Sequence, residues 1–223
     1  MKKDILMQEL DIQTWFMDEQ VFLDGADIRG QFMCREKIKG VSITCLLQKR
    51  KRLPWQYKAK TAFTIHVNNN YDDDADSNPL FARIAEEFCI EDMLKSTIGM
   101  GDWIAVQGII VGPGIEGNPY CLDAVDFYAF NLLRQSEDPT ISISYTMPCT
   151  VGEMIMRANG IKWVPSVGVI DLPMPLEKLK QYAAAPSRLN KAINREGIIC
   201  RNFSQHLHFM VPSNKAGYAI EVS

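Results

Sequence analysis

Apolar and polar residues alternate over short stretches through much of the chain, and helical spacing is confined to a few segments. Alternation with many Val, Ile, Thr and aromatic residues is typical of strands that are buried on one face. Strands are predicted over residues 36–47, 61–67, 102–111, 126–132, 141–144, 163–170, 197–200, 206–211 and 218–222. Strands outnumber helices and their connections vary in length, so the pattern favours an α+β fold with mainly antiparallel sheets.

Helical spacing is clearest after the pair formed by Asn78 and Pro79, which suit an N-cap and a first helical turn. Apolar residues then recur every four residues from Leu80 to Phe88, which predicts an amphipathic helix over residues 79–96. Two shorter helices are predicted over residues 150–159 and 175–184, and a further helix within residues 1–34. The first of the short helices begins with a capping-box match, Thr150 with Glu153, and ends at Gly160.

The composition, 47% hydrophobic and 23% charged over 223 residues, is that of a globular protein with a substantial core. We expect one domain, residues 1–223, without an accessory OB or C-terminal RNA-binding domain. The six cysteines are scattered, without metal-ligand spacing, as in a reducing compartment. No segment is apolar enough to be a signal peptide or to span a membrane, so we expect a cytoplasmic protein with no membrane partner.

Net charge is −3, so any binding to nucleic acid has to come from a local patch. One basic segment contains two aromatic residues: Lys49, Arg50, Lys51, Arg52, Trp55, Tyr57, Lys58 and Lys60. Such a segment suits single-stranded RNA, because the cations can contact phosphates and the aromatic rings can stack on bases. The alternative is an exposed hairpin whose charged face is solvated. The acidic stretch at residues 68–76 fits a solvated loop better than a calcium loop, because the required glycine and distal glutamate are missing.

Residues 112–117 match the spacing G-x-G-x-x-G after a predicted strand. Asn118 and Pro119 follow where a phosphate-binding helix would have to begin, so the context excludes a dinucleotide-binding fold.

Lys37 lies three residues before Gly40, at the start of a predicted strand. In this position its amine would stand on one face of the strand beside a tight backbone turn, as a lysine nucleophile can. In isolation the same pattern fits a strand with two solvated lysines. Three other segments change this interpretation: residues 106–118, 126–131 and 195–202. Together with residues 36–40, these segments resemble, in order and spacing, the motifs of ATP-dependent RNA ligases of the covalent nucleotidyltransferase superfamily. The resemblance runs from about Asp18 to Glu221.

The resemblance implies a nucleotidyltransferase (ATP-grasp-like ligase) fold of two mainly antiparallel sheets flanked by helices, with ATP between them and Mg²⁺ as the metal. It implies that lysine attacks the α-phosphate, that AMP passes to an RNA 5′-phosphate, and that a 3′-hydroxyl then seals the ends. Lys37 would be the nucleophile, and Glu196 would hold the metal or orient the nucleotide. The implied nucleotide-binding residues are Glu36, Ile38, Gly40, Phe127, Phe130, Arg201 and Lys215. One of the aromatic residues between Phe127 and Phe130 would stack on adenine or support that wall.

The chain departs from the family pattern at several positions where that family has a charged or polar side chain. Lys39 occupies the place of an aspartate or histidine, Ile109 that of a glutamate, and Met210 that of a lysine, while Lys215 is in a different register. The predicted strand around His66 also lacks the usual arginine. Lys39 would share a strand face with Lys37 and could partly compensate.

These departures favour a degraded transfer site in a pseudoenzyme that binds RNA, single-stranded or nicked, or a protein partner. ATP, AMP and Mg²⁺ would be cofactors only if the site still functions. Two alternatives stay open: an active RNA ligase, which seals pre-adenylated RNA or works through lysyl-AMP on Lys37, and a structural or assembly component.

Overall fold

The computed structural model of the chain describes residues 29–49, 63–68, 79–99, 102–135, 144–202 and 208–213. Backbone contacts divide the chain into two compact units. The first unit comprises Met1–Asp11, Val41–Ile110 and Asp126–Trp163, and the second comprises Ile12–Gly40, Val111–Val125 and Val164–Ser223. None of the described helices is long and apolar enough to cross a membrane.

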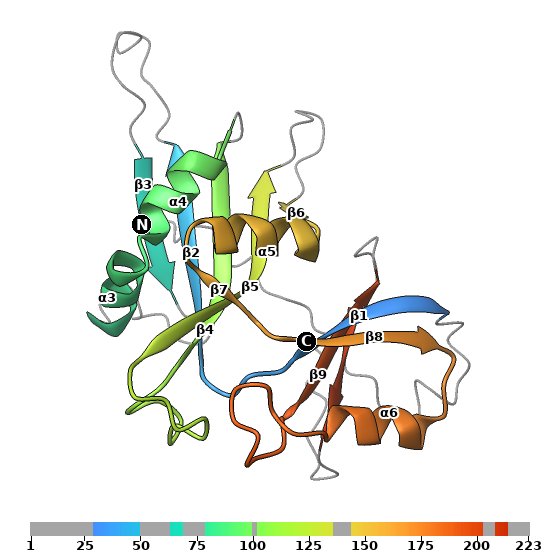
Figure 1. The fold of residues 1–223 in the computed structure, drawn as a ribbon. Coiled ribbons are helices and arrows are strands. Elements are labelled where there is room, and N and C mark those ends of the chain that lie inside the picture. Colours follow the sequence, from blue (N-terminus) through green and yellow to red (C-terminus); the bar gives the residue numbers. More distant parts are fainter. Residues whose placement is uncertain are drawn as a thin grey trace, which may run out of the picture. The chain divides into compact units, whose positions relative to one another are not determined.

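The first unit is built on a six-stranded sheet (Figure 1). Its strands are β2 (Val41–Lys49), β3 (Phe63–Asn68), β4 (Trp103–Val111), β5 (Asp126–Gln135), β6 (Ser144–Thr146) and β7 (Lys162–Trp163). Five of them are in the order β3-β2-β4-β5-β6, and the short β7 pairs in parallel with β5. Long runs of β2 and β4 are buried, which fits their Val, Ile and Leu content.

A row of uncharged polar side chains crosses the middle of this apolar sheet. Gln107 on β4 donates to Thr44 on β2 at 3.3 Å and accepts from Asn131 on β5 at 2.9 Å. All three side chains are buried. Because each of them has a partner, the row fixes the register of three strands without leaving an unsatisfied amide.

Three helices belong to the first unit: α3 (Pro79–Glu87), α4 (Ile90–Thr97) and α5 (Cys149–Ala158). The single helix predicted over residues 79–96 was wrong, because Cys89 adopts a left-handed conformation, with φ 49°, and separates α3 from α4. The capping box was also wrong. Helix α5 begins one residue earlier, after Pro148, and Glu153 pairs instead with Arg157 at 2.7 Å. The predicted end at Gly160 is confirmed, with φ 74° there.

The second unit contains a four-stranded antiparallel sheet in the order β10-β9-β1-β8. Its strands are β1 (Gly30–Glu36), β8 (Ser166–Leu172), β9 (Gly197–Asn202) and β10 (His208–Pro212). Helix α6 (Leu176–Ala183) packs its buried residues Leu179 and Ala183 into the same core as one face of the sheet. The core also contains Phe32 and Phe209, whose ring centroids are 5.2 Å apart.

Two predicted strands were wrong in the same way, because each spans two strands of different sheets. Residues 36–47 divide into the end of β1 and most of β2, and residues 163–170 divide into the end of β7 and most of β8. Buried residues continue through both junctions, including Ile38 and Val164, so hydrophobic alternation does not reveal where the chain changes sheet. The strand predicted over residues 141–144 begins at Ser144 as β6, and its first three residues, like residues 218–222, lie outside the described residues.

Candidate functional site

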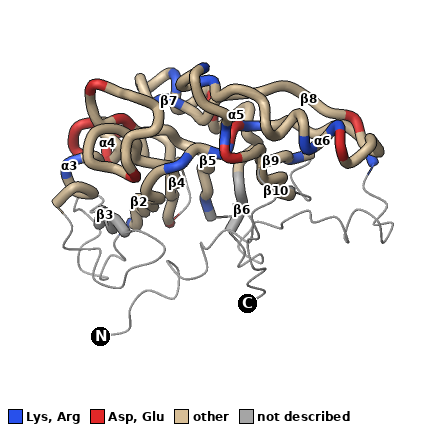
Figure 2. Tube along the Cα trace, turned by 90° about the horizontal axis from the view of Figure 1, so that it is seen from below, with Lys and Arg blue, Asp and Glu red and all other residues tan. Residues whose placement is uncertain are grey.

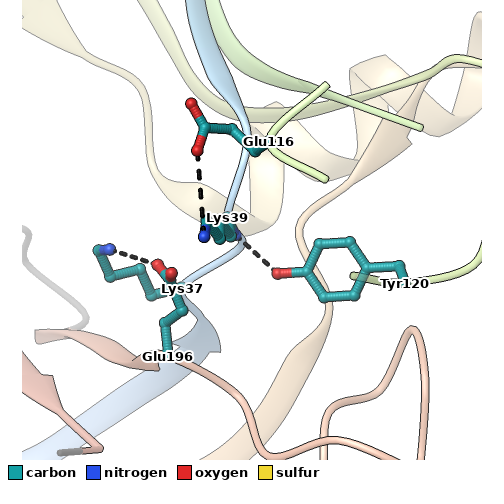
Figure 3. Close-up of polar contacts among 5 residues, drawn as sticks. All are labelled: Lys37, Lys39, Glu116, Tyr120 and Glu196. Atoms are coloured by element: carbon teal, nitrogen blue, oxygen red, sulfur yellow. Dashed lines mark hydrogen bonds and ion pairs between the residues drawn. The ribbon is translucent and has the colours of Figure 1, made fainter. Parts of the chain in front are cut away.

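The connection between β1 and β2, residues 37–40, carries both lysines of the motif (Figure 3). Two backbone hydrogen bonds hold its start: the Glu36 N–H donates to the Pro165 carbonyl and the Lys37 N–H to the Gly197 carbonyl, each at 3.0 Å. Lys37 and Lys39 are therefore in a connection and not on one strand face, which corrects the sequence expectation. Ile38 between them is buried and anchors the connection, and Gly40 ends it.

Lys37 and Glu196 meet although 159 residues separate them in the sequence. The lysine Nζ is 2.7 Å from Glu196 Oε2, and the two side chains are 33% and 30% exposed. Glu196 immediately precedes β9, which pairs with β1, so sheet pairing accounts for the meeting. The structure thus brings together the two residues to which the sequence analysis assigned catalytic roles.

Glu36 is a buried carboxylate at the end of β1, with 1% of its surface exposed. Its Oε2 accepts a hydrogen bond from the Arg188 backbone N–H at 2.7 Å. Its Oε1 is buried and has no hydrogen-bond partner among the described residues. Buried carboxylate oxygens without a donor are rare, and such an oxygen is a ready acceptor for a ligand N–H or O–H.

Lys39 makes two contacts with the glycine-rich connection between β4 and β5 (Figure 3). Its backbone N–H donates to the Tyr120 hydroxyl at 2.6 Å, and its Nζ is 4.0 Å from Glu116 Oε2. Burial raises the pKa of Tyr120 to about 12, the hydrogen bond from Lys39 opposes the shift, and the charges of Glu36 and Glu196 add to it. The phenol is therefore neutral at physiological pH, and both carboxylates are near enough to influence it.

The connection that carries Glu116 and Tyr120 has a strained backbone. Glu116, Asn118 and Cys121 have φ between 46° and 52°, a region that side chains other than glycine seldom adopt. The Asn118 side chain bonds the Leu122 backbone twice, and Asn190 donates to the Pro119 carbonyl at 3.2 Å. The sequence analysis missed both Tyr120 and Glu116 as site residues, and the only signal for them was the glycine-rich spacing that precedes them.

The implied adenine-wall residues belong to the first unit. Phe127 is fully buried, packs against Phe88 with ring centroids 5.9 Å apart, and lies beside Gly108. Phe130 is half-buried. Ile109 is also half-buried and pairs with Ser42 of β2.

Two further residues lie on the four-stranded sheet. Arg201 on β9 is buried, and Met210 on β10, opposite Ile199, is buried too. Both alternate with the core residues Cys200 and Phe209, so they are on the sheet face away from α6. Lys215 lies outside the described residues.

Of the basic segment the structure describes only Lys49. Its Nζ donates to the Gly99 carbonyl at 2.8 Å, just past the end of α4. Basic and acidic segments both occur on α6, whose sequence contains Glu177, Lys178 and Lys180 (Figure 2). The remaining members lie outside the described residues: Arg50, Lys51, Arg52, Trp55, Tyr57, Lys58 and Lys60.

Within the described ranges, no three His, Cys, Asp or Glu side chains are close enough together to hold a metal ion. Glu196, the implied metal ligand, has its described contact with Lys37 instead.

Of three comparisons with known proteins, the one with solved structures found matches. No family model matches the chain, and no curated protein matches its sequence. A solved structure of Naegleria gruberi RNA ligase with PPi matches with TM-score 0.66 and 19% identity, over 92% of this chain and 56% of that one. The same ligase as a variant with ATP and Mn matches equally well, and another variant with AMP and Mn matches at TM-score 0.65 and 20% identity.

The chain has the fold of an RNA-ligase-like nucleotidyltransferase. The α+β class with mainly antiparallel sheets, predicted from strand patterning and motif resemblance, is confirmed. The chain spans 56% of the length of these Naegleria ligase chains. The likeness, at 19% identity, concerns the fold alone.

Proposed function

We propose that this chain is an RNA-ligase-like protein that binds RNA through a retained site and has lost most of the nucleotidyl-transfer chemistry. The observation that carries the proposal is the placement of Lys39. A cation stands two residues after Lys37, where the ligase pattern has an aspartate or histidine, and its ammonium faces Glu116 at 4.0 Å.

The binding part of the proposal rests on Glu36. Its unpartnered Oε1 can accept a hydrogen bond from an amino group, such as the exocyclic amine of adenine. Supplying that donor would satisfy an oxygen whose isolation costs about 1–3 kcal/mol. An adenine amino group that reaches this oxygen, from a nucleotide or from an adenosine of RNA, would supply the missing donor.

The proposed loss of nucleotidyl transfer rests on the charged side chains that this chain lacks. Attack by Lys37 requires its amine to leave Glu196 and lose a proton, and transfer requires groups that neutralise the phosphates. Where the ligase pattern has carboxylates and a lysine, this chain has Lys39, Ile109 and Met210. Each missing charged contact is worth about 2–4 kcal/mol in the transition state, so the combined loss lowers the rate by several orders of magnitude.

The basic segment makes RNA the favoured partner. Residues 49–60 combine six cations with Trp55 and Tyr57, a composition suited to a sugar–phosphate backbone and its bases. A protein partner is the competing possibility, and the same experiment separates the two.

RNA binding is tested by fluorescence anisotropy with a 5′-phosphorylated single strand and with a nicked duplex, at several salt concentrations. We expect the Kd to rise steeply with salt, and the slope to fall by roughly one for each phosphate contact removed. Replacing Lys51 and Arg52 by alanine should weaken binding. The matched control replaces Lys178 and Lys180 on α6, which removes the same charge elsewhere. Absence of RNA binding at low salt would favour a protein partner.

A second function is supported by one observation, the retained contact between Lys37 and Glu196. Sealing of RNA that is already 5′-adenylated omits the self-adenylylation step and places smaller demands on the missing groups. Formation of a sealed product from a 5′-adenylated strand, abolished in Lys37→Ala, would establish this function in place of pure binding.

A further inference from the structure

Two cysteines face each other in the core of the second unit. Cys34 on β1 and Cys200 on β9 are directly opposite in the antiparallel pairing, and their Sγ atoms are 2.9 Å apart. Both side chains are 0% exposed and both are free thiols. Directly opposed residues of antiparallel strands have Cα atoms about 4.5–5.5 Å apart, within the range that a disulfide spans.

Three other cysteines, Cys45, Cys89 and Cys121, have no contact with a thiol among the described residues. Cys45 is equally buried and fully desolvated, which raises its pKa to about 12, and no thiol contact accompanies it. Cys89 and Cys121 are exposed, and Cys121 contacts the Asn190 amide. Burial and the neighbouring thiol also raise the pKa of Cys200, so the Cys200 thiol is unreactive while the sheet is closed.

We propose that Cys34 and Cys200 form a reversible disulfide that joins β1 to β9 beside the site that contains Lys37. Cys34 is two residues from Glu36, and Cys200 is four residues from Glu196. The bond would thus link the strands whose ends position Glu36 and Glu196. It would also secure the register in which the Lys37 N–H donates to the Gly197 carbonyl.

Glutathione disulfide is the oxidant in this reaction. The thiolate of one cysteine attacks a glutathione sulfur, which breaks the S–S bond, releases one glutathione thiolate and forms a mixed disulfide. The thiolate of the other cysteine then attacks the protein sulfur of that mixed disulfide and releases the second glutathione. Two protein thiols are oxidised, one glutathione disulfide is reduced to two thiols, and the protons pass to glutathione.

Because both sulfurs are buried, exchange proceeds through transient opening of the sheet and is slow. The native reduced protein is therefore equilibrated in glutathione buffers of increasing oxidation, and in parallel the reduced, denatured chain is refolded in the same buffers. Unreacted thiols are then blocked, and intact mass and peptide mapping identify the linked cysteines.

We expect both routes to give a monomer whose mass is lower by two hydrogens. Peptide mapping should find the peptides of Cys34 and Cys200 linked by a disulfide. This should occur at a ratio of oxidised to reduced glutathione that leaves Cys89 and Cys121 reduced. Its melting temperature should exceed that of the reduced form by several degrees, because the bond closes a loop between residues 166 positions apart. Dithiothreitol should reverse the shift. Cys34→Ser and Cys200→Ser should each abolish the linked peptide, and Cys45→Ser should retain it.

Thiols that stay reduced in the most oxidising buffer, by both routes, would overturn the proposal. Linkage that involves Cys89 or Cys121 at the same ratio would overturn it too. Equal melting temperatures for the oxidised and reduced forms would show that the bond does not stabilise the β1–β9 pairing. These mass measurements on the unmodified sequence need no variant to fold, and they are independent of whether the chain binds RNA.

Discussion

The two units of this protein place polar groups in their cores in different ways. The first unit has an uncharged row, Thr44, Gln107 and Asn131, whose hydrogen bonds run across three strands. The second unit has charged groups at or beside the ends of strands: a buried glutamate, one of whose oxygens has no partner among the described residues, and two partly exposed ion pairs. The first group is fully paired inside the sheet, whereas most of the second group is in reach of solvent, so we expect the first group to contribute more to the stability of the fold.

The largest expected effect comes from the packing of the first unit. A Cβ at Gly108 would lie 2.2 Å from the Phe127 ring and 2.7 Å from the Tyr128 carbonyl oxygen. Gly108→Ala should therefore destabilise the protein by about 3 kcal/mol in urea unfolding, because neither neighbour can yield freely. The control, Gly114→Ala, meets no atom within 4 Å and is strained only by its φ of +80°, so it should cost about 1 kcal/mol. Equal losses would contradict the packing argument.

Removing a member of the uncharged row should have the next largest effect. Asn131→Leu leaves a buried acceptor of Gln107 without its donor and should cost about 2 kcal/mol of unfolding free energy. Asn159→Leu, which removes an exposed amide bonded to the Ile155 carbonyl, should cost less than about 0.5 kcal/mol. A neutral Asn131→Leu would show that the row does not stabilise the first unit.

Tyr120 tests the second unit through its pH dependence. Its pKa is raised from 10.0 to about 12, so the neutral phenol contributes stability that is fully present below pH 10 and is lost as the pH rises from 10 to about 12. Tyr120→Phe should flatten that part of the curve of unfolding free energy against pH. At neutral pH it should cost about 1 kcal/mol, through the lost hydrogen bond from Lys39. An unchanged alkaline slope would mean that this phenol titrates normally.

The smallest effects on stability should come from the ion pairs of the site. Lys37 and Glu196 are each about one-third exposed, so a double-mutant cycle with alanine should give a coupling of about 1 kcal/mol or less. The surface pair Lys95 and Glu91 on α4 serves as the reference and should give a smaller coupling, because solvent screens it more strongly. A Lys37–Glu196 coupling above about 2 kcal/mol would mean that this pair maintains the fold, as the uncharged row does.

The sequence contained enough information to predict the fold and part of the site. Alternation located most of the strands, and the motif spacing identified Lys37 and Glu196, which the structure brings to 2.7 Å. Alternation could not reveal the sheet changes at residues 37–40 and 164–165, because buried residues continue through both. Alternation also could not reveal that Tyr120 contacts Lys39, because the two residues are 81 positions apart in the sequence. The contact depends on the strained backbone of the connection between β4 and β5.

Incubation with α-labelled ATP and Mg²⁺ or Mn²⁺ tests the central claim, that the site has lost nucleotidyl transfer to Lys37, most directly. An active RNA ligase is included as the positive control. Our account predicts no acid-stable adenylate on the wild-type chain, and none on Lys39→Asp, because Ile109 and Met210 still lack the required charge. An adenylate that forms on the wild-type chain and disappears in Lys37→Ala would contradict it.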